Sequence, residues 1–256
     1  KAKEITRRDV VGLLAGMMAR GATVTTNRTL AVVRRMFNYA VEQSILEFSP
    51  CDHVRAPAKE QRRDRVLTVE ELRAFWWGLD RARMSEPVKV ALRLLLVTAQ
   101  RKGEVAAATW QEFGMEQGWW VIPADRAKNG MSHRVPLSRG ALRLLEVARV
   151  HSDQSSYLFP SPRAEAPMGP TAIDHAVRRN LSDLGLQDFT PHDLRRTAAS
   201  MMTGQGIPRL VVSKILNHVE SGITAVYDRY CYDDEKRQAL ERWWGHLEGI
   251  LERKNG

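Results

Sequence analysis

The amino-acid sequence predicts a mainly α protein with one small antiparallel β-hairpin sheet, of class α+β. Much of its 256-residue length shows apolar side chains at the three- and four-residue spacing of helices. Two β-prone runs, Trp119–Pro123 and His133–Leu137, flank Lys128-Asn129-Gly130, and Asn-Gly between such runs indicates a hairpin. Residues 1–65 hold 13 Lys and Arg against seven Asp and Glu, while the remainder holds 26 against 23. This uneven charge indicates a separate basic segment ahead of the larger part.

The first segment is predicted to be a small helical domain. Thr6 and Asp9 have capping-box spacing, and an apolar helical pattern follows until Gly21. A second helix is predicted from Thr26 to the stop signal Ser49-Pro50. Two helices form a thin core, and the chain opens with Lys rather than Met, so we expect that an N-terminal portion of this domain is missing.

The predicted domain division is residues 1–56, a polar and basic linker over 57–66, and a second domain over 67–256. Around the hairpin, the second domain is predicted to hold helices at residues 68–79, 87–98, 138–150, 171–184 with Gly185 as C-cap, 190 onward, 210–216, about 221 onward and 234–251.

Composition excludes several classes of protein. The most apolar stretch, Val88 to Ala99, is too short to span a bilayer and contains two basic residues. Cys51 and Cys231 lie far apart and are expected to be reduced thiols of a cytoplasmic protein. We find no metal-ligand spacing, Walker loop or Rossmann fingerprint, so we predict no metal and no cofactor. The basic charge indicates a polyanion partner, most simply nucleic acid, although a solvated basic surface is the alternative.

The most informative stretch is Thr190-Pro191-His192-Asp193-Leu194-Arg195-Arg196-Thr197. Thr190 is a plausible helix N-cap, and Pro191 suits the first helical position. His192 and Arg195 then share one face near a helix N-terminus, where anions are attracted. A proton acceptor beside a bidentate cation suits a phosphodiester, whereas the simpler alternative is a solvated charged helix.

Five other residues carry functional hypotheses. Arg101 follows a buried helix, and Glu104 either pairs with it locally or orients its fork for a phosphate. Lys128 is either an ordinary hairpin-tip lysine or an amine that protonates a leaving oxygen. His218 follows a short apolar helix, and Tyr227 follows nine residues later, with Tyr230 and Tyr232 as competing phenols.

The ordered set of Arg101 in Thr-Ala-Gln-Arg-Lys-Gly-Glu, Lys128, His192-x-x-Arg195, Leu-Asn-His218 and Tyr227 resembles the tyrosine recombinase, or phage integrase, family over roughly residues 66–232. Two positions depart from the family pattern. Thr98-Ala99 stands where the family usually has Thr-Gly, and Leu216-Asn217-His218 where Leu-Gly-His is commoner.

The resemblance implies that Tyr227 attacks the scissile phosphate and forms a 3′-phosphotyrosyl link. It further implies that Arg101, Arg195 and His218 hold the nonbridging oxygens, and that His192 helps to accept the tyrosine proton. Lys128 protonates the leaving oxygen, with Lys102 or His133 next in line for that role, and Glu104 supports the site. The N-terminal segment resembles the end of the family's core-binding domain, and Arg28, Arg34, Arg35, Arg62, Arg63 and Arg65 are its predicted DNA-binding residues.

The implied protein is a metal-independent site-specific DNA recombinase of a phage or mobile island. It would act in a bacterial cytoplasm, at the nucleoid, on duplex DNA with paired sites, as a homotetramer and with accessory DNA-bending proteins. The segment after the tyrosine packs on a neighbouring protomer in the family, and Trp243, Trp244, Leu247 and Leu251 form a suitable stripe that could instead pack on its own protomer. A type IB topoisomerase and a catalytically silent DNA-binding protein remain as alternatives.

Overall fold

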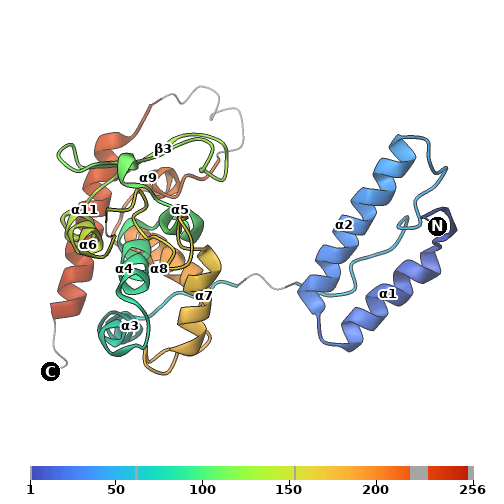
Figure 1. Ribbon diagram of the computed structural model, residues 1–256, viewed down its shortest axis with the longest axis horizontal. Helices are drawn as coiled ribbons and strands as arrows, with labels where there is room; N and C mark the ends of the chain where they lie inside the picture. Colours follow the sequence, from blue (N-terminus) through green and yellow to red (C-terminus); the bar gives the residue numbers. More distant parts are fainter. Residues whose placement is uncertain (1, 61–62, 153, 220–229, 253–256) are drawn as a thin grey trace. The chain divides into compact units, whose positions relative to one another are not determined.

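The structure, a computed structural model, describes residues 2–60, 63–152, 154–219 and 230–252. The chain divides into two compact units, Lys1–Arg63 and Asp64–Gly256 (Figure 1). The division falls inside the segment 57–66, which is polar and poor in apolar periodicity.

The first unit is built on two helices, α1 (Arg7–Ala19) and α2 (Thr23–Glu42), after a short 3-10 turn at Ala2–Glu4. The predicted capping box of α1 is present, since the Thr6 N–H donates to Asp9 at 2.8 Å. The predicted bounds of α2 are wrong at both ends. The helix begins three residues before Thr26, whose hydroxyl donates to the Ala22 carbonyl at 2.6 Å within the first turn. It ends at Glu42 because the chain turns at Ser44, which has a positive φ of 56°.

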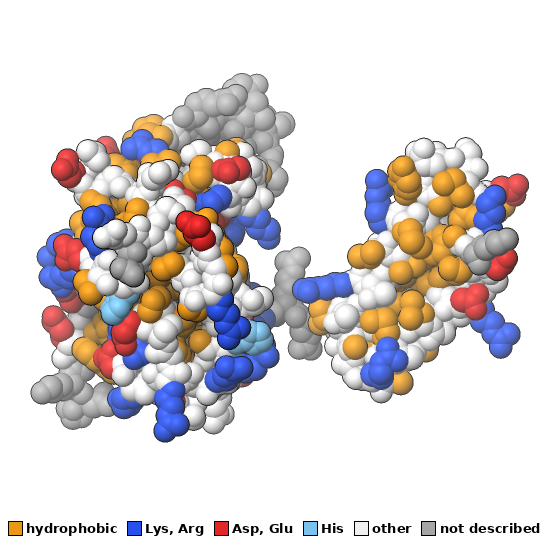
Figure 2. All heavy atoms as spheres, viewed as in Figure 1, with side chains coloured by type: hydrophobic (Ala, Val, Ile, Leu, Met, Phe, Trp, Pro, Cys, Tyr) orange, Lys and Arg blue, Asp and Glu red, His pale blue; other side chains and the backbone are white. Residues whose placement is uncertain are grey.

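The core of the first unit is small. Its buried members are Val10, Leu14, Leu30, Phe37, Cys51 and Val54. Large apolar side chains lie in solvent on the same two helices, among them Val32 at 70% exposure and Met36 at 52%, and Figure 2 shows hydrophobic side chains spread over the face of this unit.

The second unit is mainly helical. Its elements are α3 (Val69–Arg81), α4 (Glu86–Thr98), α5 (Lys102–Ala106), η2 (Trp110–Glu112), β1 (Phe113–Gly114), β2 (Trp119–Ile122), β3 (His133–Pro136), α6 (Arg139–His151), α7 (Pro170–Arg179), α8 (Pro191–Gly204), α9 (Arg209–Ile215) and α11 (Asp233–Glu252). The apolar helix α4 lies in the middle of this unit and packs against α3, α5, α6, α7, α8 and α11 (Figure 1). The capping box at Thr68 and the N-caps at Thr190 and Ser138 begin α3, α8 and α6 as predicted, and Thr190 forms a capping box with Asp193.

The sheet confirms the predicted fold class and adds one short strand. Strands β1, β2 and β3 are antiparallel in that order, with Trp120 opposite Val135 in the β2–β3 pair. The predicted Asn-Gly hairpin is longer than a two-residue turn, because residues 123–132 connect the strands. Within that connection a β-turn closes from the Gly130 N–H to the Ala127 carbonyl at 2.9 Å.

Helix α7 ends at Arg179, five residues before the predicted end at Leu184. Asn180 follows as its C-cap, and its buried side chain donates to the Ala176 carbonyl at 2.8 Å and accepts from the Arg83 N–H at 2.7 Å. Gly185, at a φ of 65°, ends the turns that come after the helix rather than the helix itself. The helix predicted from about Ser221, which would carry Tyr227, lies outside the described residues.

The C-terminal helix α11 packs on its own chain. Trp243 and Leu247 are fully buried, and the Trp243 indole donates to the Leu96 carbonyl of α4 at 3.0 Å. Gly140 of α6 admits the Trp244 ring so closely that a Cβ at that position would lie 2.2 Å from a ring carbon. The hydrophobic stripe of α11 is therefore packed into the core of this unit.

Among the described residues, no helix is both long and apolar enough to cross a membrane.

Candidate active site

The first part of the site is a sharp turn at the end of α4. Ala99 adopts a left-handed conformation with a φ of 55°, which reverses the chain and places Arg101 as the N-cap of α5. The buried Glu104 then binds this arginine twice, through its backbone N–H at 3.0 Å and its Nη1 at 2.9 Å. Glu104 therefore fixes both the backbone and the guanidinium of Arg101, while its role in orienting this arginine for a phosphate stays a prediction.

Helix α8 supplies the second part. The Asp193 carboxylate accepts from the Thr190 N–H at 2.8 Å, so the helix begins with Pro191 at its first position and His192 and Arg195 in its first turns. Arg195 is only 4% exposed. Its Nη1 donates to the Ala99 carbonyl at 2.6 Å and its Nη2 donates to the Leu216 carbonyl.

The C-terminal end of α9 joins these segments. The last carbonyls of a helix have no partner within the helix and attract donors and cations. The Ile215 carbonyl accepts from the Gln100 side chain at 3.0 Å and lies 3.0 Å from Nε2 of His133. Because the carbonyl can only accept, His133 is the Nε2–H tautomer.

The two following carbonyls bind the arginines. Leu216 accepts from Arg195, and Asn217 accepts from Nη2 of Arg101 at 3.1 Å. Asn217 has a φ of 48°, so the chain turns there into His218. The structure thereby brings Arg101, Arg195 and the segment of His218 together, although they come from three separate regions of the sequence.

The departures from the family pattern fall at backbone positions with positive φ. Ala99 and Asn217 both adopt left-handed conformations, which glycine reaches without steric cost and which asparagine tolerates better than alanine. The glycines of the family pattern therefore suit the turns that these two residues make here.

Electrostatics favours neutral imidazoles beside charged arginines. Partial burial, followed by the charges of Arg196 and Arg195, lowers the pKa of His192. Partial burial and the charges of Arg195 and Arg101 also lower the pKa of His218. Burial lowers the pKa of Arg195 to about 10, so the guanidinium keeps its charge at neutral pH. Both imidazoles remain exposed and are able to accept a proton.

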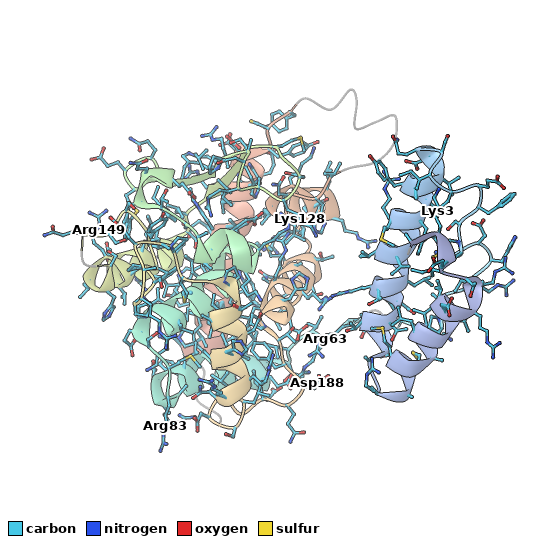
Figure 3. All side chains as sticks on the ribbon, turned by 45° about the vertical axis from the view of Figure 1, so that its right-hand side comes forward. Lys3, Arg63, Arg83, Lys128, Arg149 and Asp188 are labelled. Atoms are coloured by element: carbon cyan, nitrogen blue, oxygen red, sulfur yellow. The ribbon has the colours of Figure 1, made fainter. Side chains whose placement is uncertain are left out.

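Lys128 and the two alternative proton donors lie in different environments. Lys128 is exposed on the β2–β3 connection and is labelled in Figure 3. Lys102 forms an ion pair with Asp174. His133 is buried, and its burial lowers its pKa to about 4. Of these three groups, Lys128 is the only exposed ammonium, and it forms no ion pair with any of the described residues.

Tyr227 lies outside the described residues, so the structure does not place the predicted nucleophile. Of its two competitors, Tyr230 packs edge-on against Tyr232 with ring centroids 4.8 Å apart. A hydrogen bond to Glu235 raises the pKa of Tyr230, which makes its phenolate harder to form.

The predicted DNA-binding arginines fall into two groups. Arg28 and Arg35 are exposed on α2, and Arg35 forms only a surface ion pair with Glu42. Arg34 donates to the Val54 carbonyl, while Arg65 binds Glu71 at 2.7 Å and the Gln187 carbonyl at 3.0 Å. Arg34 and Arg65 therefore also hold their own units together. Arg63 is partly exposed, and Arg62 lies outside the described residues.

Sequence reasoning missed Gln100, Asn129 and the structural role of His133. Gln100 is fully buried and binds both the Thr98 and Ile215 carbonyls. The sequence does show an amide just after an apolar helix and one residue before Arg101. It does not show the partner of this amide, the Ile215 carbonyl, because that group lies 115 positions away. No group of three or more His, Cys, Asp or Glu side chains within the described part of the chain is arranged to hold a metal ion.

The fold, a mainly helical unit with a three-stranded sheet preceded by a small helical unit, is similar to that of lambda integrase. The chain belongs to the phage integrase family, whose profile matches residues 65–233.

Relatives and solved structures agree with this assignment. Prophage integrase IntA of Escherichia coli K12 is 28% identical over 248 residues, which cover 95% of this chain and 59% of the relative. The chain thus spans about three fifths of the length of such curated relatives. A lambda integrase (75-356) dimer bound to a COC′ core site has a similar fold, with a TM-score of 0.67, 20% identity and coverage of 85% and 80% of the two chains. A lambda integrase tetramer bound to a Holliday junction also has a TM-score of 0.67, with 18% identity and coverage of 86% and 66%.

Proposed function

We propose that this protein is a site-specific DNA recombinase that cuts and rejoins strands through a 3′-phosphotyrosyl intermediate. The observation that carries the proposal is the convergence of Arg101 and Arg195 at the end of α9, next to His218. Carbonyl groups and the buried Glu104 carboxylate fix these two guanidiniums near each other. Such a pair favours an anion that both can bind, for example a phosphodiester. Membership of the phage integrase family supports this choice of substrate.

The proposed cleavage step is a balanced exchange of esters. The Tyr227 phenol oxygen attacks phosphorus, the bond from phosphorus to the 5′ oxygen breaks, and a free 5′-hydroxyl results. His192 takes the phenol proton, for which its lowered pKa is suitable, and Lys128 supplies a proton to the leaving oxygen. Rejoining reverses these transfers on a second strand. The phosphotyrosine conserves the energy of the broken ester, so the proposed reaction uses neither a nucleotide nor a metal.

Stabilisation of the transition state is assigned to fixed cations. Arg101, Arg195 and His218 would bind the nonbridging oxygens, where negative charge develops. Glu104 and the Asn217 carbonyl hold Arg101, and the Ala99 and Leu216 carbonyls hold Arg195, before DNA arrives. These contacts limit reorganisation during the reaction.

The first unit is proposed to bind duplex DNA through its backbone phosphates, with Arg28 and Arg35 as exposed contacts and Arg34, Arg62 and Arg63 as further candidates. Arg65, at the start of the second unit, is a further candidate contact. Since a lambda integrase tetramer binds a Holliday junction, we propose a homotetramer on two paired sites. Accessory DNA-bending proteins and action at the nucleoid of a bacterial host complete the proposal.

Trapping of a covalent adduct on a nicked candidate site tests this function. The parent protein should form a protein–DNA adduct, and Tyr227→Phe should bind the DNA equally well without forming one. Tyr230→Phe is the matched control and should form the adduct normally. An adduct that persists in Tyr227→Phe and disappears in Tyr230→Phe would overturn the assignment of the nucleophile. Relaxation of supercoils without joining of two sites would identify a topoisomerase instead.

A further inference from the structure

Asn129 and Asn217 form a reciprocal side-chain pair across the site. The Asn129 amide donates to the Asn217 Oδ1 at 2.8 Å, and the Asn217 amide donates to the Asn129 Oδ1 at 3.3 Å. A longer contact of 3.4 Å runs from the Asn129 amide to the Asn217 carbonyl. The pair joins the β2–β3 connection to the turn after α9, although the two residues are 88 positions apart.

Each partner is fixed on its own side. The Asn217 carbonyl binds Arg101, and Asn217 lies between the Arg195-bound Leu216 and His218. On the other side, the Asn129 Oδ1 also accepts from the Met131 N–H at 3.2 Å, and the turn closes from Gly130 to Ala127 at 2.9 Å. Lys128 is adjacent to Asn129 within this turn. The pair therefore ties the backbone that carries Lys128 to the backbone that holds both guanidiniums.

We infer that Asn217 and Asn129 are positioning residues that hold the Lys128 turn in place for proton donation. The inference rests on the proposed function. Lys128 is exposed on a long connection, so without a tether its ammonium would spend little time at the leaving oxygen. An amide at position 217 supplies that tether while it tolerates the left-handed backbone, whereas the glycine of the family pattern has no side chain to do so.

The inference is testable because Asn217→Gly separates the two contributions of Asn217, which are its side-chain hydrogen bonds and its tolerance of the left-handed backbone. Asn217→Gly keeps the backbone conformation at a φ of 48° without strain but removes the bridge. Asn129→Ala removes the other half. Met131→Ala is the matched control, since Met131 is 52% exposed in the same connection and lends only its backbone to the pair.

Cleavage of an oxygen substrate and of a substrate with sulfur at the 5′ bridging position gives the decisive comparison. Sulfur leaves without protonation, so a variant that has only misplaced the acid regains its rate on sulfur. Asn217→Gly should cleave the oxygen substrate roughly 10- to 100-fold more slowly, the scale of a small misplacement of a catalytic group, and should approach the parent rate on sulfur. The Asn129→Ala/Asn217→Gly double variant should be no slower than the slower single variant, because both changes break the same bridge.

Limited trypsin digestion after Lys128, without DNA, supplies an independent readout. Both asparagine variants should be cut faster than the parent, and Met131→Ala should match the parent. The inference would be overturned if the asparagine variants lost equal rate on the oxygen and sulfur substrates, or if they behaved like Met131→Ala. The proposed function would still stand in that case, provided that the parent protein forms the adduct. A parent that forms no adduct would overturn both.

Discussion

At the scale of single residues, the site is defined by which polar groups are bound inside the protein and which remain exposed. Arg195 is buried and donates to the Ala99 and Leu216 carbonyls, whereas Lys128 is exposed. A bound guanidinium suits charge stabilisation, which needs a fixed position. An exposed ammonium suits proton donation to a group that arrives with the substrate. The two cations are therefore expected to respond differently to a change of leaving group.

Lys128→Ala should cleave ordinary DNA more slowly by about 10²–10⁴-fold, the usual range for a lost general acid, and should run close to the parent rate on a 5′-thio substrate. Arg195→Ala should be slow on both substrates, because charge on the nonbridging oxygens still has to be stabilised. Single-turnover cleavage of both substrates is the measurement. Equal impairment of Lys128→Ala on both would make the lysine a phosphate contact, and Lys102→Ala and His133→Gln would then be compared in the same assay.

His133 links stability to pH. Burial lowers its folded-state pKa to about 4 from 6.5, so the unfolded chain takes up this proton at a higher pH than the folded protein. The contribution of the neutral His133 to stability should therefore be fully present above about pH 6.5. The free energy of unfolding should fall by up to about 3 kcal/mol as the pH drops toward 4. Urea unfolding between pH 4 and 7 measures the slope. His133→Gln, which keeps a donor for Ile215, should flatten it, and an unchanged slope would show that other groups cause the loss.

At the scale of elements, the end of α9 and the face of α11 organise the second unit. Three successive carbonyls of α9 and its C-terminal turn bind donors from the α4–α5 turn, β3, α8 and the β2–β3 connection. Helix α11 supports this arrangement from outside, since it packs on α9, α3, α4 and β3 (Figure 1). Close packing of α11 on α6 requires Gly140, over which the Trp244 ring lies.

Gly140→Ala should destabilise the protein by about 1–3 kcal/mol, the usual cost of an added methyl group in a well-packed core, because the new Cβ would meet the ring of Trp244. Thermal unfolding measures the loss. Gly12→Ala on α1 is the control, since a Cβ there meets nothing within 4 Å. A Gly140→Ala variant as stable as the parent would show that the Trp244 ring moves aside at little cost.

At the scale of the whole molecule, charge is divided between the two units. Residues 1–65 carry an excess of six positive charges, and Arg28 and Arg35 are exposed there. Neutralised phosphates release counterions, so removing an arginine that neutralises a phosphate lowers the salt dependence of DNA binding. Chemistry and DNA affinity should therefore be separable by substitution.

Arg28→Gln/Arg35→Gln should weaken DNA binding and reduce the slope of log K against log salt by about 0.9 for each phosphate that is no longer neutralised. The rate of adduct formation at saturating protein should stay near that of the parent. Arg139→Gln, which removes an exposed arginine of the second unit, is the control and should leave the slope unchanged. If the Arg28→Gln/Arg35→Gln variant keeps the parent slope, as the control does, these two arginines are solvated surface residues that neutralise no phosphate.

The sequence by itself determined the elements whose signals are local. The capping boxes at Thr6, Thr68 and Thr190 and the apolar run of α4 involve residues a few positions apart, and each begins or forms a helix close to where it was predicted. The order of Arg101, Lys128, His192, Arg195, His218 and Tyr227 was also sufficient to indicate the family, which the matched profile confirms. Their catalytic roles remain predictions.

Only the tertiary structure decided which groups bind one another. Arg195 and the Ala99 carbonyl are 96 positions apart, and Asn129 and Asn217 are 88 apart, so no local pattern contains these pairs. Tertiary packing also placed the stripe of α11 on its own chain. The physical reason is that the partner of a buried polar group depends on which segments cross near it, and that crossing is set by the packing of the whole core.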